Sequence, residues 1–504
     1  MEKITRKISA LLVVLVGLSS AGAQEQPRPA TTGTLILSLE DALRIALGQS
    51  ETVWVAEAGV MRALGNERIA RSGYFPQIAG TASYTRTLRS QFQDLDFGGG
   101  GEEPPDGEDG GFEDLPFGRI NQYSLGLSLT QTVFDAGQTR ARNRAAEARL
   151  RAAEIDVESA QAETLLDVTQ SYFDALLGDR LVQIAEANLA QTEEILRQTR
   201  VAREVGDRSE FELLRARVAR DNQLPVLLQR RTERTEAYLR LKQLLDVPLG
   251  NDVVLTTGVE DLPAQFASPS DLSPEQRAPV RQAEETVEAS RAQLVETRAQ
   301  RLPSVVLSSR YAPVAYPESG LPEPGDFRED WTVTLSLSVP LLTWGRLRGN
   351  EMVAEGTLTE ARARLEQTRE AAELDARVAQ NDLAEAQAVL ESNTGTVQEA
   401  VRAYEIAQIR FREGISSQIE LADARLLLEQ AEVNRARALR NVQVARARLA
   451  LLADLPLGLG LELQPSQPLP QQPQQQQTPS VPGITVASPV PGVTTGGFGP
   501  GGTP

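Results

Sequence analysis

The stretch GDRSEFEL at residues 206–213 recurs as GISSQIEL at residues 414–421, a separation of 208 positions. The same separation relates two more pairs, DVPLG at 246–250 with DLPLG at 454–458, and FDAG at 134–137 with LTWG at 342–345. Three ungapped matches over more than a hundred positions indicate an internal duplication. Upstream, Phe75-Pro76 and Leu302-Pro303 are related by 227 positions, so the first copy holds 19 extra residues, where the Gly- and acid-rich stretch Gly98–Asp114 lies.

Each copy predicts the same order of elements, namely helix, strand, loop, strand, long helix, tight turn and long helix. In the first repeat, 24–250, we expect a helical region 39–72 broken near Ser50, strands 77–88 and 121–134, and helices 138–204 and 208–246. In the second repeat, 277–458, we expect a helix 277–301, strands 304–312 and 331–340, and helices 347–412 and 416–453. A linker, 251–276, joins them, and the Pro-, Gln- and Gly-rich residues 459–504 are expected to form a disordered tail.

The predicted strands alternate between apolar and small polar side chains. In 121–134 the apolar face is formed by Tyr123, Leu125, Leu127, Leu129 and Val133. Alternation over about ten residues is typical of a transmembrane β-barrel, although a soluble sandwich with one buried face would show it too. A possible aromatic girdle at the lipid interface favours the barrel, and its members are Tyr84, Tyr123, Tyr311 and Trp331. Four strands cannot close a barrel and open edges are not tolerated in lipid, so several chains must build it together.

The helices between strand and turn are unusually long. From Gly137 to Gly206 a continuous helix would extend roughly 100 Å at the usual rise per residue. Apolar residues recur at spacings of three and four, with many alanines, as in coiled-coil-like seams. A glycine followed by Ser or Asp at each turn, as at Gly414 and Ser416, predicts a tight antiparallel reversal.

The first 23 residues are expected to be a secretory signal peptide. A basic segment precedes the apolar run Ile8–Leu18, and Ala21-Gly22-Ala23 supplies small residues for cleavage before Gln24. An N-terminal membrane anchor is the alternative, but the apolar run is too short to span about 30 Å of hydrocarbon.

Composition excludes several classes of protein. The 504 residues carry 51 Lys and Arg against 69 Asp and Glu, a formal charge of −18, which argues against a nucleic-acid partner. Because the chain has no Cys and no His, thiol catalysis, Ser-His-Asp triads and His- or Cys-based metal sites are excluded. No cofactor or metal is expected, and any acid-dependent gating must involve carboxylates.

At this point the sequence resembles the TolC family of outer-membrane efflux and secretion channels. The residues that carry the resemblance are Leu39-Glu40-Asp41-Ala42, Tyr74-Phe75-Pro76-Gln77-Ile78 and Arg410-Phe411-Arg412-Glu413-Gly414, together with the duplication. The resemblance implies a homotrimer in which four strands per chain form a twelve-stranded barrel in the outer membrane, continued by a long α-helical barrel in the periplasm. It implies a passive exit duct of a tripartite efflux pump or a type I secretion system. A periplasmic adaptor would couple it to an inner-membrane pump, and the chain would have no enzymatic activity.

The resemblance also implies roles for residues at the turns. Family channels close at the periplasmic tip, and the positions of its acidic ring fall on Glu420 and Asp423, with Glu212 at the matching position of the first repeat. Where the family commonly places a gate-bracing arginine this chain has Ser416, so Arg208 and Phe411 become the bracing candidates. The adaptor is expected to contact the tips at Gly206, Ser209, Gly414, Ser416 and Ser417.

Two other classes of protein fit the sequence less well. A soluble periplasmic coiled-coil adaptor would need a lipoyl-like or β-barrel domain with Gly-rich turns, and would lack the duplicated four-strand plan. A glycosidase could use paired carboxylates, but the acids here lie on long heptad-like helices without a pocket signature.

Overall fold

A computed structural model describes residues 34–88, 121–258, 266, 273–317 and 321–458. The expected signal peptide 1–23, the stretch Gly98–Asp114 and the tail 459–504 lie outside the described residues.

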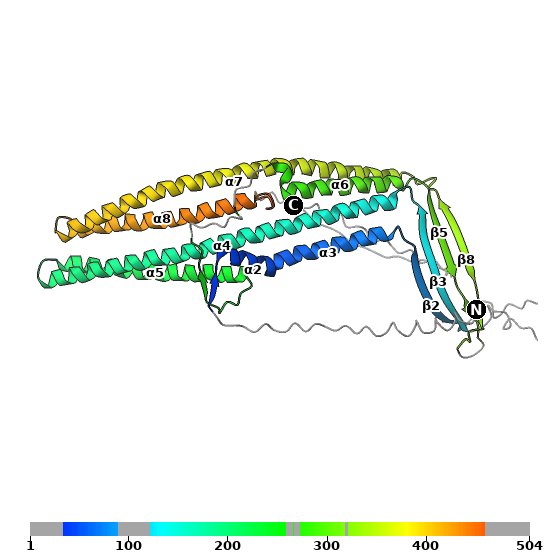
Figure 1. The fold of residues 1–504 in the computed structure, drawn as a ribbon, viewed down its shortest axis with the longest axis horizontal. Coiled ribbons are helices and arrows are strands. Elements are labelled where there is room, and N and C mark those ends of the chain that lie inside the picture. The colour runs from blue at the N-terminus through cyan, green and yellow to red at the C-terminus, as the bar shows by residue number, and fades with distance from the viewer. Residues whose placement is uncertain (1–33, 89–120, 259–265, 267–272, 318–320, 459–504) are drawn as a thin grey trace, which may run out of the picture. The chain divides into compact units, whose positions relative to one another are not determined.

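Two long helical hairpins make up most of the described chain (Figure 1). The first is α4 (Gln138–Glu204) with α5 (Glu210–Leu244), and the second is α7 (Arg346–Arg412) with α8 (Gln418–Leu451). α4 and α7 are 67 residues each and begin 208 positions apart. At 1.5 Å per residue each is about 100 Å long, so the turns and the strands lie at opposite ends of these helices (Figure 1).

Shorter helices pack alongside each hairpin. Residues 39–72 form α2 (Leu39–Gln49) and α3 (Glu51–Ser72), and α6 (Ala278–Ala299) is the counterpart of α3 in the second repeat. Ser50 separates α2 from α3, because its N–H still donates to Ala46 while its hydroxyl accepts the N–H of Val53 and starts a new helix. Small residues permit close approach between helices, and a Cβ at Gly178 of α4 would lie 3.1 Å from Cα of Arg234 in α5.

Four antiparallel strands from both repeats form one sheet in the order β2 (Gln77–Arg86), β3 (Asn121–Phe134), β5 (Ser304–Tyr311) and β8 (Trp331–Ser338). Three of them end one or two residues before the expected positions. The two-residue strands β6 (Val314–Ala315) and β7 (Phe327–Arg328) extend the sheet beside β3. The sheet therefore joins the two copies of the duplicated unit.

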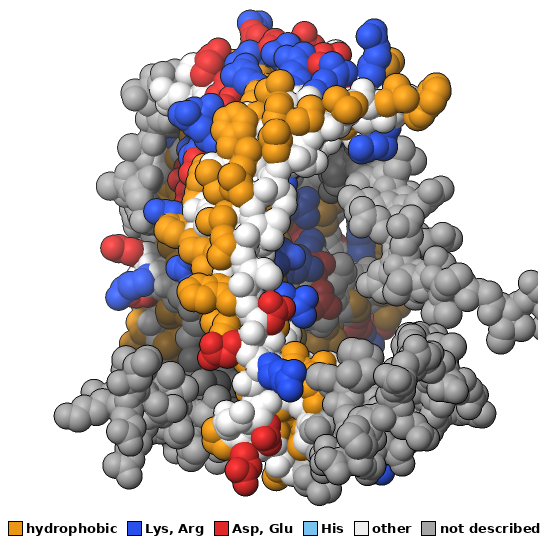
Figure 2. Space-filling model, turned by 90° about the vertical axis from the view of Figure 1, so that its right-hand side faces the viewer, with side chains coloured by type: hydrophobic (Ala, Val, Ile, Leu, Met, Phe, Trp, Pro, Cys, Tyr) orange, Lys and Arg blue, Asp and Glu red, His pale blue; other side chains and the backbone are white. Residues whose placement is uncertain are grey.

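The register places most of the apolar side chains of the four strands on one face, since directly opposed residues share a face, and Val306 of β5 lies on the other face opposite Ser336. Leu125 is opposite Ala82, and Leu335 is opposite Leu307. Figure 2, which views the end of the molecule that carries the sheet, shows hydrophobic side chains gathered beside a strip of backbone and small polar side chains. A β-bulge between Thr132 and Phe134 interrupts the alternation, so Phe134 and not Val133 opposes an apolar residue of β5.

A second, two-stranded sheet was not anticipated by the sequence analysis. β1 (Leu35–Leu37) pairs in parallel with β4 (Val253–Leu255), which lies within the expected linker 251–276, and a short 3-10 helix, η4 (Pro274–Gln276), follows before α6. The hydroxyl of Tyr172 in α4 connects the strands, because it donates to the carbonyl of Leu37 at 3.1 Å and accepts the N–H of Thr257 at 3.1 Å.

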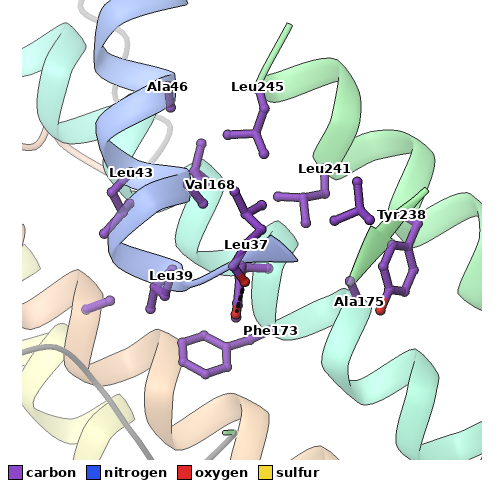
Figure 3. Packing of buried hydrophobic residues seen from close by; sticks show 14 of the residues in the cluster. Leu37, Leu39, Leu43, Ala46, Val168, Phe173, Ala175, Tyr238, Leu241 and Leu245 are labelled. Carbon is purple, nitrogen blue, oxygen red and sulfur yellow. Dashed lines mark hydrogen bonds between the residues drawn. The ribbon is translucent and has the colours of Figure 1, made fainter. Parts of the chain in front are cut away.

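The largest apolar core surrounds this small sheet. Leu37 of β1, Leu39 of α2, Val168 and Phe173 of α4, and Leu241 of α5 are fully buried and point toward one another (Figure 3). The core therefore fixes the start of the first repeat against the middle of α4.

None of the helices in the described part of the chain combines the length and the apolar character needed to cross a membrane.

Candidate functional site

The hairpin tips are two short turns whose backbone requires glycine. Gly206 and Gly414 have φ of +86° and +71°, in the left-handed region that glycine adopts without steric cost. After each glycine the chain turns back to the preceding helix, since the N–H of Asp207 donates to Ala202 and the N–H of Ile415 donates to Arg410, both at 2.9 Å.

The helix after each tip begins at a serine. Ser209 and Glu212 form a reciprocal pair, in which the Ser209 hydroxyl accepts the N–H of Glu212 and the Glu212 carboxylate accepts the N–H of Ser209 at 3.0 Å. Ser417 accepts the N–H of Glu420 at 3.4 Å. The hydrogen bond from the Ser209 backbone, followed by the Arg208 guanidinium, lowers the pKa of Glu212 below its ordinary value.

A pH dependence of the first tip follows from this lowered pKa. Ionised Glu212 stabilises the tip above the ordinary Glu pKa of 4.5, and the contribution is lost as the pH falls through the lowered folded-state value. We expect Glu212→Gln to destabilise the tip by roughly 0.5–1 kcal/mol at pH 7 and to match the wild type in strong acid. Hydrogen exchange of tip peptides at both pH values measures this, with exposed Glu193→Gln as the control. A difference that persists in strong acid would contradict the assignment.

Arg208 connects the two hairpin tips. Its guanidinium donates to the Glu212 carboxylate at 3.0 Å and to the backbone carbonyl of Phe411 at 3.4 Å, and its Cζ lies 4.6 Å from the centroid of the Phe411 ring. A guanidinium at this distance from an aromatic face makes a favourable cation–π contact. The structure therefore brings Arg208, Glu212 and Phe411 together.

Phe411 is anchored in a small apolar cluster of the second tip. The cluster contains Tyr404, Ala407 and Leu421, and Ile195 from α4 packs against it. The Phe411 ring that Arg208 contacts is therefore buried in a cluster formed by both helices of the second hairpin, against which a residue of the first hairpin packs.

The two acids of the second tip lie in different environments. Glu420 forms an ion pair with Arg410 at 3.5 Å, and both side chains are about half exposed. Asp423 lies three residues later on the same side of α8, is exposed, and has no hydrogen bond or ion pair within the described residues. Glu212 contacts Arg208 and Ser209 of the first tip, and it contacts neither Glu420 nor Asp423.

At the tips apolar side chains are exposed, and so are Ser209 and Ser417. Val205 is 77% exposed, Ile415 is 68% exposed and Phe211 is 70% exposed, whereas Ser416 is buried at 8%. Ser416 is thus poorly placed to contact a partner. The sequence analysis missed these apolar residues and the role of Arg410, although an apolar residue adjacent to a tip glycine is itself a usable signal.

The four expected girdle residues form two cross-strand pairs. Tyr84 opposes Tyr123 with ring centroids 4.7 Å apart, and Tyr311 opposes Trp331 with centroids 6.4 Å apart. Tyr311 lies opposite Leu127 of β3, four residues along from Tyr123, so the two pairs are staggered along the strands.

Within the described residues no cluster of three or more acidic side chains is arranged to hold a metal ion.

Comparison with known proteins gives one family. A family model described as outer membrane efflux protein matches residues 42–246 and 271–453. The probable efflux pump outer membrane protein SepC of Pseudomonas putida is 27% identical over 62% of this chain and 65% of its own length. Nodulation protein T of Rhizobium leguminosarum bv. viciae is 25% identical over 65% of this chain and 68% of its own length. The chain thus spans about two thirds of these relatives.

Among solved structures, the Campylobacter jejuni CmeC outer membrane channel has a similar fold. Its TM-score is 0.68 at 19% identity, covering 83% of this chain and 86% of the channel.

Proposed function

Because the chain belongs to the outer membrane efflux protein family, we propose that three copies of it assemble into one exit duct of an efflux pump. The chain is an outer-membrane efflux protein with a periplasmic helical portion, and its channel fold and duplicated family domain agree with the expectation from sequence.

The sheet supports an assembly of several copies. β2 and β8 are its outer strands, and the outer edge of each has no strand partner within the described residues. The apolar face of β8 is open, with Val333 and Leu335 66% and 67% exposed. Unpaired strand edges are not tolerated in lipid, so pairing β8 of one copy with β2 of the next, three times, would close a twelve-stranded barrel.

The tips support a gate with an acidic lining. Three-fold repetition of Glu420 and Asp423 around a narrow passage would concentrate negative potential there and favour cations. Unpartnered Asp423 is the stronger contributor, because the Arg410 guanidinium partly offsets the charge of Glu420. The ion selectivity of the channel is therefore the property that these acids should control.

Single-channel recording in a planar bilayer, with a salt gradient, tests both the duct and the gate. We expect long-lived cation-selective openings from the purified protein, and a loss of selectivity in the Glu420→Gln, Asp423→Asn double variant. Removing a nearby unit charge changes the energy of a passing ion by about 1 kcal/mol, roughly a fivefold change in permeability ratio.

The matched control is Glu154→Gln with Asp156→Asn, which removes the same charge from α4 roughly 75 Å from the tip. If the tip variant opens with unchanged ion selectivity, Glu420 and Asp423 do not line the gate, and the proposal of an exit duct still stands. No channel activity from folded helical protein would contradict the duct itself.

Arg208 is expected to hold the closed state, because it joins the first tip to Phe411 of the second. In Arg208→Ala the lost cation–π contact and ion pair total about 1 kcal/mol per copy, so opening frequency should rise roughly fivefold or more. Arg197→Ala is the control, since Arg197 pairs with Glu194 on its own helix. Equal opening frequencies in the two variants would show that Arg208 does not brace the gate.

The exposed apolar tips suit a periplasmic adaptor, through which an inner-membrane pump would act. Val205 and Phe211 flank the first turn, and Ile415 lies in the second. Site-specific photocrosslinking from Val205 should capture a helical adaptor, whereas crosslinking from exposed Met61 of α3 should not.

A further inference from the structure

The second repeat contains a fully buried arginine at the start of α6. The Arg277 guanidinium donates to Oδ2 of Asp375 at 2.8 Å and to the carbonyls of Ala372 and Leu455, each at 3.4 Å. Arg448 donates to the other oxygen of Asp375 at 3.0 Å. Arg277 and Asp375 are each 1% exposed. A buried carboxylate is stable here because two guanidinium groups neutralise and hydrogen-bond it.

The first repeat has the same acceptors without the arginine. Because α4 and α7 begin 208 positions apart, the counterparts of Ala372, Asp375, Arg448 and Leu455 are Thr164, Asp167, Arg240 and Val247. α3 and α6 begin 227 positions apart, which places Ser50 where Arg277 stands. The Ser50 hydroxyl contacts Thr164 at 3.3 Å and the N–H of Val53 in its own helix, and it makes no hydrogen bond with Asp167. Asp167 is exposed and has no hydrogen bond or ion pair in the described part of the chain.

The same difference recurs one helical turn later. Arg281 of α6 pairs with Asp454 at 3.1 Å. The corresponding positions of the first repeat hold Trp54 and Asp246, and the Asp246 side chain has no partner among the described residues. The first repeat therefore has both carboxylates, Asp167 and Asp246, but Ser50 and Trp54 stand where the second repeat has Arg277 and Arg281.

An open cleft of about 920 Å³ occupies the place of the missing arginine. It lies between the start of α3, the middle of α4 and the end of α5, and Ser50, Thr164, Asp167, Arg240 and Val247 all line it. Its charged lining consists of four carboxylates and two cations, Glu51, Asp167, Glu236, Asp246, Arg240 and Lys242. Partial desolvation raises the pKa of Asp167.

We propose that this cleft, defined by Asp167, Ser50 and Thr164, binds a guanidinium group supplied from outside the repeat. The second repeat shows the geometry, in which one planar group is bound by a carboxylate and by the backbone of two flanking elements. The group would come from a free guanidinium compound or from an arginine of a neighbouring polypeptide in the assembly. Either source would give Asp167 the partner that Asp375 already has.

Calorimetric titration of the purified protein with agmatine, a free guanidinium compound, tests the site. Putrescine, which has the same carbon chain and an amine in place of the guanidinium, is the matched probe. We expect saturable agmatine binding that is about tenfold or more weaker in Asp167→Asn, because the charge-assisted hydrogen bond to the carboxylate is lost. Asp156→Asn, on the same helix outside the cleft, should bind agmatine like the wild type, and putrescine should bind more weakly than agmatine.

Ser50→Arg supplies the residue that the second repeat has at this position. We expect the new guanidinium to pair with Asp167 and to prevent agmatine binding. A Ser50→Arg protein that still binds agmatine like the wild type would place the ligand elsewhere and overturn the assignment.

Thermal unfolding of the same variants separates the two sources. If a neighbouring arginine already fills the cleft, agmatine will not bind, but Asp167→Asn will lower the midpoint while Asp156→Asn will not. Equal agmatine affinity in Asp167→Asn overturns the proposal. The proposal is also overturned if the wild type does not bind agmatine and Asp167→Asn does not lower the midpoint.

Discussion

Asp375→Ala is expected to destabilise the chain by about 3–5 kcal/mol, because it leaves a buried guanidinium without its counter-charge. Arg277 is 1% exposed, and its remaining acceptors would be two carbonyls at 3.4 Å. The effect should centre on the region where α6, α7 and the end of α8 meet. Urea unfolding followed by circular dichroism measures it as a lower midpoint.

A matched control lies on the same helix. Asp382 also pairs with Arg448, at 3.2 Å, but its side chain is 47% exposed. Since exposed ion pairs contribute about 0–1 kcal/mol, Asp382→Ala should leave the midpoint almost unchanged. Equal shifts for the two variants would mean that the buried position of Asp375 confers no special stability.

Phe173→Ala is expected to cost about 3–5 kcal/mol, the range for removing a buried aromatic ring. Phe173 is fully buried in the core around the two-stranded sheet and contacts Tyr172 edge to face, with ring centroids 6.1 Å apart. Loss of the ring would leave a cavity beneath β1 and loosen the start of the first repeat from α4. Tryptic cleavage near β1 and the urea midpoint should both report this change.

The control for this prediction is Phe211→Ala, which removes the same ring from an exposed position in the first tip. Phe211 is 70% exposed, so the stability change should stay within about 0.5 kcal/mol. A Phe173→Ala midpoint equal to that of Phe211→Ala would show that the small sheet does not depend on this core.

Helices, turns and strand alternation could be predicted from the sequence, because they depend on residues that lie close together along the chain. The offset of 208 positions placed both long helices, because coiled-coil-like spacing and a glycine turn depend on residues within a few positions of one another. The alternation of β3 predicted its apolar face up to the bulge that follows Thr132, where an extra residue makes Phe134, and not Val133, oppose Val305.

The resemblance predicted Arg208, Glu212 and Phe411 as tip residues, and their mutual contacts came from the structure. Neither the spacing of the apolar residues nor the residues of the turns could predict that the Arg208 guanidinium of one hairpin lies over the Phe411 ring of the other. That contact depends on how α4 packs against α8, and on the cluster that holds Phe411 in place.

The sequence by itself determined the duplication and the lengths of the helices, because each depends on local patterns repeated along the chain, and the resemblance to a known family implied the channel fold. Only the tertiary structure decided that β1 pairs with β4, that Arg277 is buried against Asp375, and that Asp167 has no such partner. Pairing between distant segments is selected by shape and by the cost of burying charge. Those quantities exist only once the segments are packed together.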